Sequence, residues 1–314
     1  MIGQWATLQH HIIPIHLHLT KDPRSDELEA FCDMMKSCTQ NVHLVKDKDN
    51  TFDIPAINLG NTITYQGIPQ GDKLQPFLQL LSDIGNQDAP MDSQYQLPSE
   101  KIPGLLTLFV ANQCPYCTVI FKDLSQLALA NELIHLTVID GLFFSELAEK
   151  NQVQSVPTLI VSEGMRWVGQ FRLKEIMDYL VDRDPIHLSM SSLENIILQG
   201  KAIELAEIMI DRQQVFPAII DLLTHPFFSI RLGAMTIMET IAESHRLIAL
   251  PIIPSLVDRF DKTTDVIKGD LIYILGEIAN KEYVAFIENS KANHENPDIK
   301  EACDEAIEKI LSHQ

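Results

Sequence analysis

The chain opens with a stretch in which apolar and polar residues alternate. Over residues 11–19, isoleucine and leucine occupy one face while His16 and His18 occupy the other. This period of two predicts a β-strand. Apolar residues at helical spacing follow, and Ser25 or Asp26 can cap a helix that extends to about Ser37. The first elements are therefore expected to be a strand and an amphipathic helix.

The pattern up to residue 90 predicts three more strands and a closing helix. The strands are expected at residues 42–46, 54–57 and 62–66, and the helix at 72–84. Pro55 stands near the start of the middle strand, where a residue without an amide hydrogen is tolerated. Residues 1–90 thus have the pattern of one α/β unit.

A similar order of elements recurs over residues 91–185. Pro157 opens a strand there, as Pro55 does in the first unit. The repetition predicts a mixed sheet covered by helices. The expected elements are a strand at 105–110, a helix after 115, a strand at 133–139, a short helix at 143–150, a hairpin of 157–161 and 166–170 around a turn at 162–165, and a helix at 173–181.

From about residue 190 the pattern is helical to the end of the sequence. Two stretches align at an offset of 37 residues, from Pro217 to Pro254, and a looser third copy falls on residues 298–310. Repeated helix pairs of this length resemble HEAT-type solenoids, which form extended binding surfaces. An ordinary helical bundle is the alternative.

The most specific chemical signal is Cys114-Pro115-Tyr116-Cys117, which follows the strand predicted at 105–110. A cysteine between a strand and a helix lies at a helix N-terminus, where unpaired N–H groups and the helix dipole favour the thiolate. The thiolate is the form that attacks a disulfide. Pro115 fits the first turn of the helix, because its missing N–H costs nothing there.

Two other interpretations of the cysteines find less support. A zinc site needs four ligands, and Cys32, Cys38 and Cys303 offer no second close pair beside Cys114 and Cys117. Cys32 and Cys38 lie six residues apart on one predicted helix, a rise of about 9 Å. A disulfide needs Cα atoms within about 7 Å, so these two are expected to be small buried or half-buried residues.

Residues 91–185 resemble the thioredoxin/glutaredoxin superfamily. Cys-Pro-Tyr-Cys is the glutaredoxin form of the motif, and Val156-Pro157 is similar to the cis-proline element. The resemblance implies that Cys114 is the nucleophile, that Cys117 resolves the mixed disulfide, and that the bond before Pro157 is cis. Residues 168–172 lack the Gly-Gly pair of glutathione-dependent glutaredoxins, so glutathione is not expected as obligatory reductant. The substrate groove is expected to be framed by Asn112, Gln113, Pro115, Tyr116, Val156 and Pro157.

Residues 11–183 are also similar to the N-terminal domain of alkyl hydroperoxide reductase flavoproteins and to two-fold protein disulfide oxidoreductases. The similarity lies in Lys48-Asp49-Asn50-Thr51, in residues 139–141 and in residues 153–157. It implies one continuous double sheet and an electron-relay role. No G-x-G-x-x-G opens a βα unit in the sequence, so a separate reductase is expected as donor. The expected acceptor is a protein disulfide, with a peroxiredoxin as one candidate.

Length, composition and charge indicate a multidomain protein and argue against nucleic-acid-binding and membrane-spanning classes. The chain has 314 residues, 46% of them hydrophobic, which suits two or three domains. A net charge of −19 argues against nucleic-acid binding. No apolar run approaches the ~18 residues of a membrane span, and residues 1–11 lack a secretory signal pattern, so a cytoplasmic protein is expected. His10, His11, His16 and His18 have no carboxylate cluster beside them and are not expected to bind metal.

The sequence therefore predicts an α/β region followed by an all-α region. The expected domains are a degenerate thioredoxin-like unit over 1–90, a thioredoxin/glutaredoxin-like unit over 91–185 and a HEAT-like domain over 186–314. The first unit is called degenerate because Lys21-Asp22-Pro23-Arg24 replaces the cysteine motif. The expected function is a thiol–disulfide oxidoreductase without metal or cofactor, whose repeats bind the partner. The alternative is a non-catalytic redox-sensing adaptor or scaffold.

Overall fold

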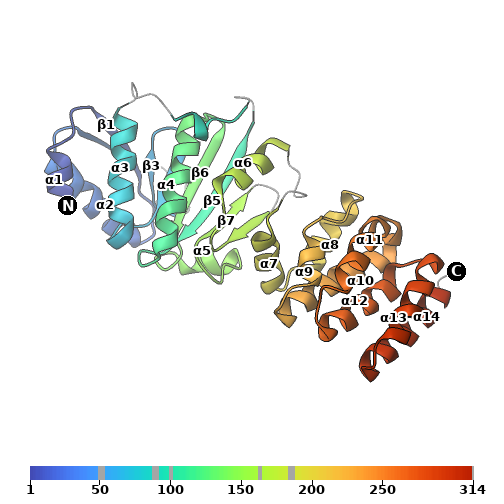
Figure 1. Ribbon diagram of the computed structural model, residues 1–314. Coiled ribbons are helices and arrows are strands. Elements are labelled where there is room, and N and C mark those ends of the chain that lie inside the picture. Colours follow the sequence, from blue (N-terminus) through green and yellow to red (C-terminus); the bar gives the residue numbers. More distant parts are fainter. Residues whose placement is uncertain (49–53, 87–91, 99–101, 162–164, 183–187, 313–314) are drawn as a thin grey trace. The chain divides into compact units, whose positions relative to one another are not determined.

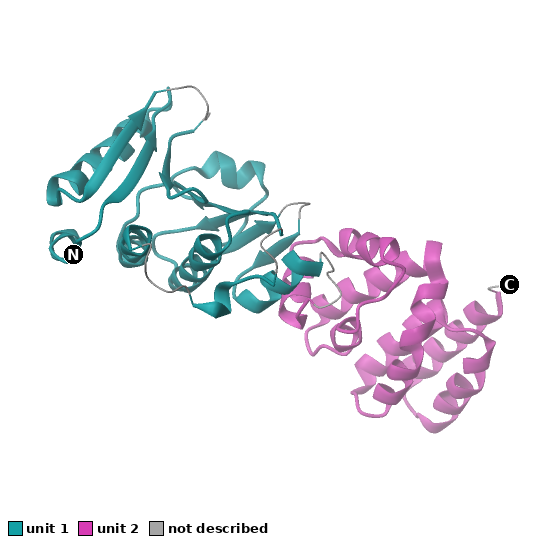
Figure 2. Cartoon of the chain, turned by 90° about the horizontal axis from the view of Figure 1, so that it is seen from above, with its two compact units in different colours: residues 1–183 teal, residues 184–314 magenta. Residues whose placement is uncertain are grey.

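The computed structural model describes residues 1–48, 54–86, 92–98, 102–161, 165–182 and 188–312. The chain divides into two compact units, residues 1–183 and 184–314 (Figure 2). The first is an α/β unit and the second consists of helices. Three expectations fall partly outside the described residues: the similarity at Asp49-Asn50-Thr51, the hairpin turn at 162–164 and the boundary near residue 185.

One eight-stranded sheet extends through unit 1, in the order β2-β1-β3-β4-β6-β5-β7-β8 (Figure 1). Every strand predicted from the sequence is present, with bounds that differ by at most two residues. In β1, Ile13, Ile15 and Leu17 are at most 1% exposed, which confirms the alternation. The strands are β1 Ile13–His18, β2 Val42–Asp47, β3 Ala56–Leu59, β4 Ile63–Gln66, β5 Gly104–Val110, β6 Ile134–Asp140, β7 Thr158–Val161 and β8 Arg166–Val168.

The two halves of the sheet have the same internal order. In each, a parallel pair (β1 with β2, β5 with β6) is extended by two antiparallel strands (β3 and β4, β7 and β8). The halves join where β4 pairs with β6 in parallel, with Ile63 opposite Leu136 and Gln66 opposite Ile139. Backbone hydrogen bonds therefore make the sheet continuous from one half to the other.

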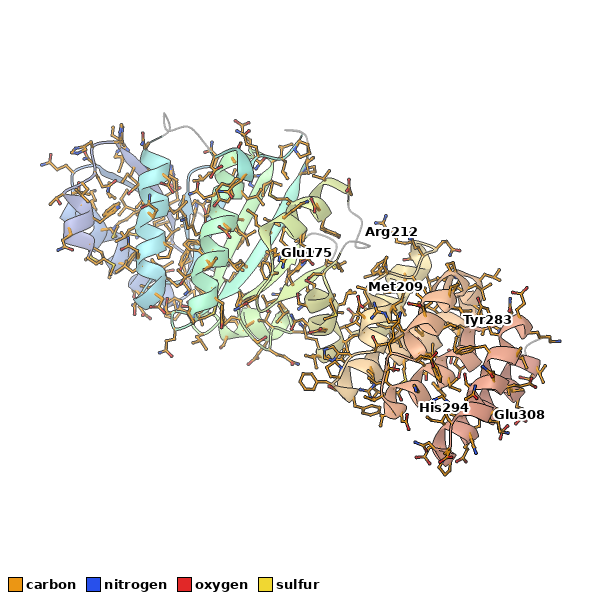
Figure 3. All side chains as sticks on the ribbon, viewed as in Figure 1. Glu175, Met209, Arg212, Tyr283, His294 and Glu308 are labelled. Carbon is orange, nitrogen blue, oxygen red and sulfur yellow. A yellow bond between two sulfur atoms is a disulfide. The ribbon has the colours of Figure 1, made fainter. Side chains whose placement is uncertain are left out.

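Helices cover this sheet. α3, α4 and α6 contact one another in turn and form one layer (Figure 1). The indole Nε1 of Trp167 donates to Oε1 of Glu175 at 2.9 Å and so joins β8 to α6. Figure 3 labels Glu175 in this helix. The helices are α1 Ile2–Ala6, α2 Arg24–Cys38, α3 Leu74–Gly85, α4 Pro115–Ala130, α5 Ser145–Lys150 and α6 Leu173–Asp182, with the 3₁₀ turns η1 Gly71–Lys73 and η2 Ser93–Tyr95.

Two details of unit 1 differ from the prediction. α2 has Pro23 at its N-cap and no side-chain cap, so neither Ser25 nor Asp26 caps it. The hydroxyl of Ser25 instead bonds the backbone of Thr20, accepting from its N–H at 3.0 Å and donating to its carbonyl at 3.1 Å. The short helix α1 is not predicted, because five residues are too few to show helical periodicity. Its Trp5 is buried.

Unit 2 is a stack of helices in which α10 packs on α12, and α12 on α14. α10 and α12 begin at Phe228 and Asp265, the spacing of the internal repeat. A Cβ atom on Gly276 of α12 would lie 2.9 Å from Cα of Ala306 in α14, so glycine permits this close approach. The helices are α7 Met190–Leu198, α8 Ala202–Asp211, α9 Ile219–Leu223, α10 Phe228–His245, α11 Ile253–Phe260, α12 Asp265–Ile278, α13 Val284–Asn293 and α14 Pro297–Ser312, with the 3₁₀ turns η5 Arg246–Ile252 and η6 Lys281–Tyr283.

A buried ion pair joins two of these helices. Nε of Arg231 in α10 lies 2.6 Å from Oδ2 of Asp270 in α12, with the two side chains 4% and 19% exposed. The same guanidinium donates to the carbonyl oxygens of His225 and Pro226 at 2.9 and 3.1 Å. The arginine thus has carboxylate and carbonyl acceptors, which a buried charge requires.

Candidate active site

The two cysteines of the motif lie at the N-terminus of α4, as predicted. Cys114 is the N-cap residue, in extended conformation, and Pro115 opens the helix. The backbone N–H of Cys117 points at Sγ of Cys114 over 3.2 Å. An N-cap side chain normally accepts a hydrogen bond from the first turn. In the reduced protein this N–H would stabilise negative charge on the Cys114 sulfur.

Cys114 and Cys117 are joined in a disulfide, with Cα atoms 5.4 Å apart. The two ends of this bond differ in accessibility. Cys117 is fully buried, whereas Cys114 is partly exposed. An attacking or leaving thiol can therefore reach Cys114 more readily than Cys117.

The Val156–Pro157 element lies against the same sulfur. Its peptide bond is cis, as the resemblance implies. Sγ of Cys114 is 3.6 Å from the carbonyl oxygen of Val156. Pro157 is buried at the start of β7, while Pro115 and Tyr116 are exposed, the latter by 55%. The structure thus brings Cys114 and Val156 together beside a solvent-facing Pro115–Tyr116 surface.

Asn112 does not have the position expected of a groove residue. Its Nδ2 donates to Oδ2 of Asp140 at 3.0 Å, and its Oδ1 accepts from the backbone N–H of Gln70 at 3.3 Å. The amide therefore binds inward, to the sheet and to a loop of the first half. A neighbouring residue, Gln113, is exposed and remains available to a substrate.

The loop of residues 67–73, which belongs to the first half, packs against the cysteine motif. Gly67 has φ of +149°, and a Cβ there would lie 2.8 Å from Cβ of Asp140. Gly71 has φ of +53°, and its Cβ would lie 3.3 Å from the carbonyl oxygen of Asn112. Glycine is suited to both positions because it adopts positive φ without a steric penalty. These glycines let the two backbones approach closely.

Lys73 is the most unusual residue of this loop. Its side chain is only 1% exposed. Nζ donates to the backbone carbonyl of Cys114 at 2.6 Å and to Oγ1 of Thr118 at 2.9 Å. Burial lowers the pKa of Lys73, while Asp72 and Asp140 act in the opposite direction. A residue from the first half, which lacks the Cys114–Cys117 motif, thus contacts the nucleophile candidate directly.

The sequence interpretation missed Lys73, Thr118 and the inward role of Asn112. One signal for Lys73 was present. It stands at the N-terminal end of α3, where a positive charge opposes the helix dipole. A lysine in that position needs a compensating partner, and here the partners are a carbonyl and a hydroxyl at the start of α4.

The other three cysteines are free thiols away from this site. Cys32 and Cys303 are buried and Cys38 is exposed. Cys32 and Cys38 form no disulfide, in agreement with their predicted spacing. Burial raises the pKa of Cys32 to about 12 and that of Cys303 to about 11. High pKa values make both poor nucleophiles at neutral pH.

Two features are absent from the part of the chain that the structure describes. In those ranges, no group of three or more histidine, cysteine or acidic side chains could hold a metal ion. No helix among the same residues is both long and apolar enough to cross a lipid bilayer.

Comparisons with known proteins point to the same region. Residues 106–182, less than half of the chain, match the family model of the thioredoxin domain. The alkyl hydroperoxide reductase protein AhpF from Pseudomonas aeruginosa is 23% identical over 125 residues, which are 39% of this chain and 24% of that protein. The match therefore spans about a quarter of that relative's length.

Two solved structures have a similar backbone. The NTD_N/C domain of the alkylhydroperoxide reductase AhpF from Enterococcus faecalis covers 57% of this chain and 95% of its own, with 19% identity and a TM-score of 0.49. A protein disulfide oxidoreductase from Aeropyrum pernix covers 60% and 92%, with 12% identity and a TM-score of 0.50. The chain thus contains a thioredoxin-like domain, with sequence similarity to AhpF and a fold similar to that of a protein disulfide oxidoreductase.

Proposed function

We propose that this protein is a thiol–disulfide oxidoreductase that works through Cys114 and Cys117. One observation carries the proposal: an accessible N-cap cysteine is joined to a buried one, 3.6 Å from the carbonyl of Val156. A structural disulfide would have no need of a helix N-terminus or of one exposed sulfur. A thiol that must ionise, attack and be released needs both.

The reaction proceeds by two exchanges. The Cys114 thiolate attacks one sulfur of the substrate disulfide, a Cys114–substrate bond forms, and the other substrate sulfur leaves and takes up a proton. The Cys117 thiol then loses its proton and attacks Sγ of Cys114. The substrate's second thiol is released and protonated, and the Cys114–Cys117 disulfide remains. The substrate gains two electrons and two protons, which a separate dithiol reductase restores to the protein.

The exposed residues around Cys114 would hold the substrate. The carbonyl of Val156 faces the sulfur and is the backbone group nearest to an incoming chain. Gln113, Pro115 and Tyr116 are exposed beside it. Because the relative from P. aeruginosa is part of an alkyl hydroperoxide reductase, a peroxiredoxin disulfide is the first protein substrate to test. Glutathione is expected to be a poor donor.

We infer further that residues 1–90 are a degenerate copy of the second unit. The equal strand order of the two halves supports this. So does the turn after β1, where Arg24 begins α2 just as Pro115 begins α4 after β5.

The helical unit is proposed to be a HEAT-like array that binds the protein partner. Support comes from the regular packing of α10 on α12 and α12 on α14. The start of α10 also exposes large apolar side chains: Phe227 by 69%, Phe228 by 55% and Leu232 by 50%. Neighbouring exposed aromatic residues are typical of protein-binding surfaces.

Reduction of a chromogenic aromatic disulfide with dithiothreitol as donor tests the activity. Cys114→Ser should abolish turnover, whereas Cys38→Ser, which alters an exposed free thiol, should leave it unchanged. Cys117→Ser should trap a mixed disulfide between Cys114 and the substrate, visible by mass spectrometry. Wild-type protein that gives no turnover above the uncatalysed rate, or a Cys117→Ser variant that traps nothing, would favour the redox-sensing adaptor instead.

A further inference from the structure

We infer that Lys73 is a positioning residue of the dithiol site, which holds the first turn of α4 and stabilises the Cys114 thiolate through its charge. The inference rests on the proposed function, and it gives the first half, which lacks the cysteine motif, a part in the chemistry. Lys73 belongs to η1, 41 residues before Cys114, yet its ammonium bonds the backbone of that residue.

Geometry is the first argument. A lysine 1% exposed and bonded at 2.6 and 2.9 Å has a fixed position. Its two acceptors, the carbonyl of Cys114 and the hydroxyl of Thr118, lie at the N-cap and in the helix that follows it. The Thr118 hydroxyl lies 3.3 Å from the carbonyl oxygen of Asp72, which ties the helix to the same turn of the first half. The motif is therefore held from outside its own half.

Charge is the second argument. The backbone N–H of Cys117 in α4 already points at the Cys114 sulfur, and an ammonium bonded to the backbone of Cys114 adds a full positive charge. A nearby cation favours the thiolate over the thiol. Because the side chain is buried, salt screens this charge less than it would a surface lysine. Burial lowers the pKa of Lys73, and the charged groups that face it, Asp72 and Asp140, raise that pKa in opposition.

The alternative is that Lys73 only fills space between the halves. The two possibilities differ in what happens when the disulfide is reduced. If Lys73 stabilises the thiolate, the thiolate must stabilise protonated Lys73 to the same extent, because the coupling is reciprocal. A space-filling lysine would titrate alike in both redox states.

The experiment is the pH profile of Cys114 alkylation by iodoacetamide in the reduced full-length protein. Lys73→Met removes the charge and the hydrogen-bond donor, Lys73→Gln removes the charge but keeps a donor on a shorter side chain, and Lys73→Arg keeps the charge. We expect Lys73→Met and Lys73→Gln to raise the pH midpoint of Cys114 alkylation by about one unit. At a pH below the midpoint, this shift lowers the alkylation rate about tenfold. Arg should restore most of the rate. Lys122→Met, an exposed lysine on α4, should leave the profile unchanged.

A measurement on the wild-type protein avoids any folding defect of the variants. The titration of the Lys73 ammonium, followed by nitrogen NMR, should move to higher pH when the disulfide is reduced. Equal Lys73 titration in both redox states, or a Lys73→Gln profile equal to the wild type, would overturn the role of Lys73 while leaving the proposed function intact. A wild-type Cys114 midpoint like that of a free cysteine would overturn the activated nucleophile itself.

Discussion

The guanidinium carbon of Arg24 lies 4.2 Å from the centroid of the Phe144 ring. Arg24 begins α2, directly after the turn that follows β1, while Phe144 lies between β6 and α5 in the other half of the sheet. The arginine also donates to the carbonyl of Phe143 at 2.7 Å and pairs with Asp22 and Glu146. The start of α2 therefore contributes contacts that join the two halves of the sheet.

Arg24→Met should lower the free energy of unfolding by about 2–4 kcal/mol, the combined size of one cation–π contact and a charged hydrogen bond. Arg24 lowers the pKa values of Asp22 and Glu146 below their ordinary 3.8 and 4.5. A depressed carboxyl pKa stabilises the fold above the unfolded value and loses this effect as the pH falls through the folded value. The difference in the free energy of unfolding between Arg24→Met and the wild type should thus become smaller below about pH 4. Urea unfolding at several pH values measures it, and a constant difference would contradict the ion-pair contribution.

Labelling of the folded, oxidised protein should discriminate among the three free cysteines. Iodoacetamide at neutral pH is expected to modify Cys38 and to spare Cys32 and Cys303, because burial both shields these two thiols and raises their pKa values to about 12 and 11. Peptide mass spectrometry reads the outcome directly. Unfolding in urea should make all three react, which serves as the control. Fast labelling of Cys32 in the folded state would show that α2 opens locally.

Replacing either of two glycines in α12 by alanine should change the stability of the protein in opposite directions. Gly276→Ala places a Cβ 2.9 Å from Cα of Ala306 and should destabilise the protein by about 1–2 kcal/mol through overpacking. Gly269→Ala meets nothing within 4 Å and should stabilise it by about 0.5–1 kcal/mol through helix propensity. Thermal unfolding of both variants is the measurement. If Gly276→Ala stabilised as well, α12 and α14 would not be in close contact.

Asp270→Ala should destabilise the helical unit by about 2–3 kcal/mol, because it leaves the buried guanidinium of Arg231 without its carboxylate. Asp258→Ala is the matched control. The carboxylate of Asp258 pairs with Lys262 on the surface, where the side chains of Lys262 and Asp258 are 67% and 74% exposed, and its loss should leave stability nearly unchanged. Denaturant titration compares the two. Similar effects would mean that the buried pair contributes no more than a surface pair.

Truncation after Asp184 tests the division of labour, because the chain separates into compact units between residues 183 and 184. The fragment 1–184 should fold and should reduce a small aromatic disulfide as fast as the full chain. It should lose reduction of its protein partner, since the helical unit is proposed to bind that partner. A folded fragment that fails on the small disulfide would indicate that the helical unit contributes to the dithiol site.

Much of the fold follows from local pattern. Alternation in β1 and helical spacing in α4 depend on residues close in sequence, and the strand–cysteine–helix order brings Cys114 to an N-cap without knowledge of other contacts. The predicted cap of α2 is wrong because local pattern does not decide which partner a side chain takes. Ser25 has the side chain of a capping residue, but a tertiary turn uses its hydroxyl for the backbone of Thr20.

The remainder of the site could not be predicted, because it depends on contacts between distant segments. Lys73 and Cys114 are joined by a hydrogen bond although they lie 41 residues apart in the sequence. Asn112 has the exposed-loop pattern of a substrate-binding residue, yet its amide binds Asp140 and Gln70. These contacts form because the two halves approach closely at Gly67 and Gly71. The sequence pattern does not show this approach, so it does not show that Lys73 and Asn112 turn inward.

The pairing of β4 with β6 has a consequence for how the chain can be divided. Ile63 to Gln66 of one half bond Leu136 to Ile139 of the other, so neither half has a free inner edge. Separate expression of the second half would uncover β6 along this length. An uncovered strand recruits another strand, from a second copy or from a neighbouring chain. The isolated half would therefore tend to self-associate, and this liability makes the first half indispensable even though it carries no cysteine pair for exchange.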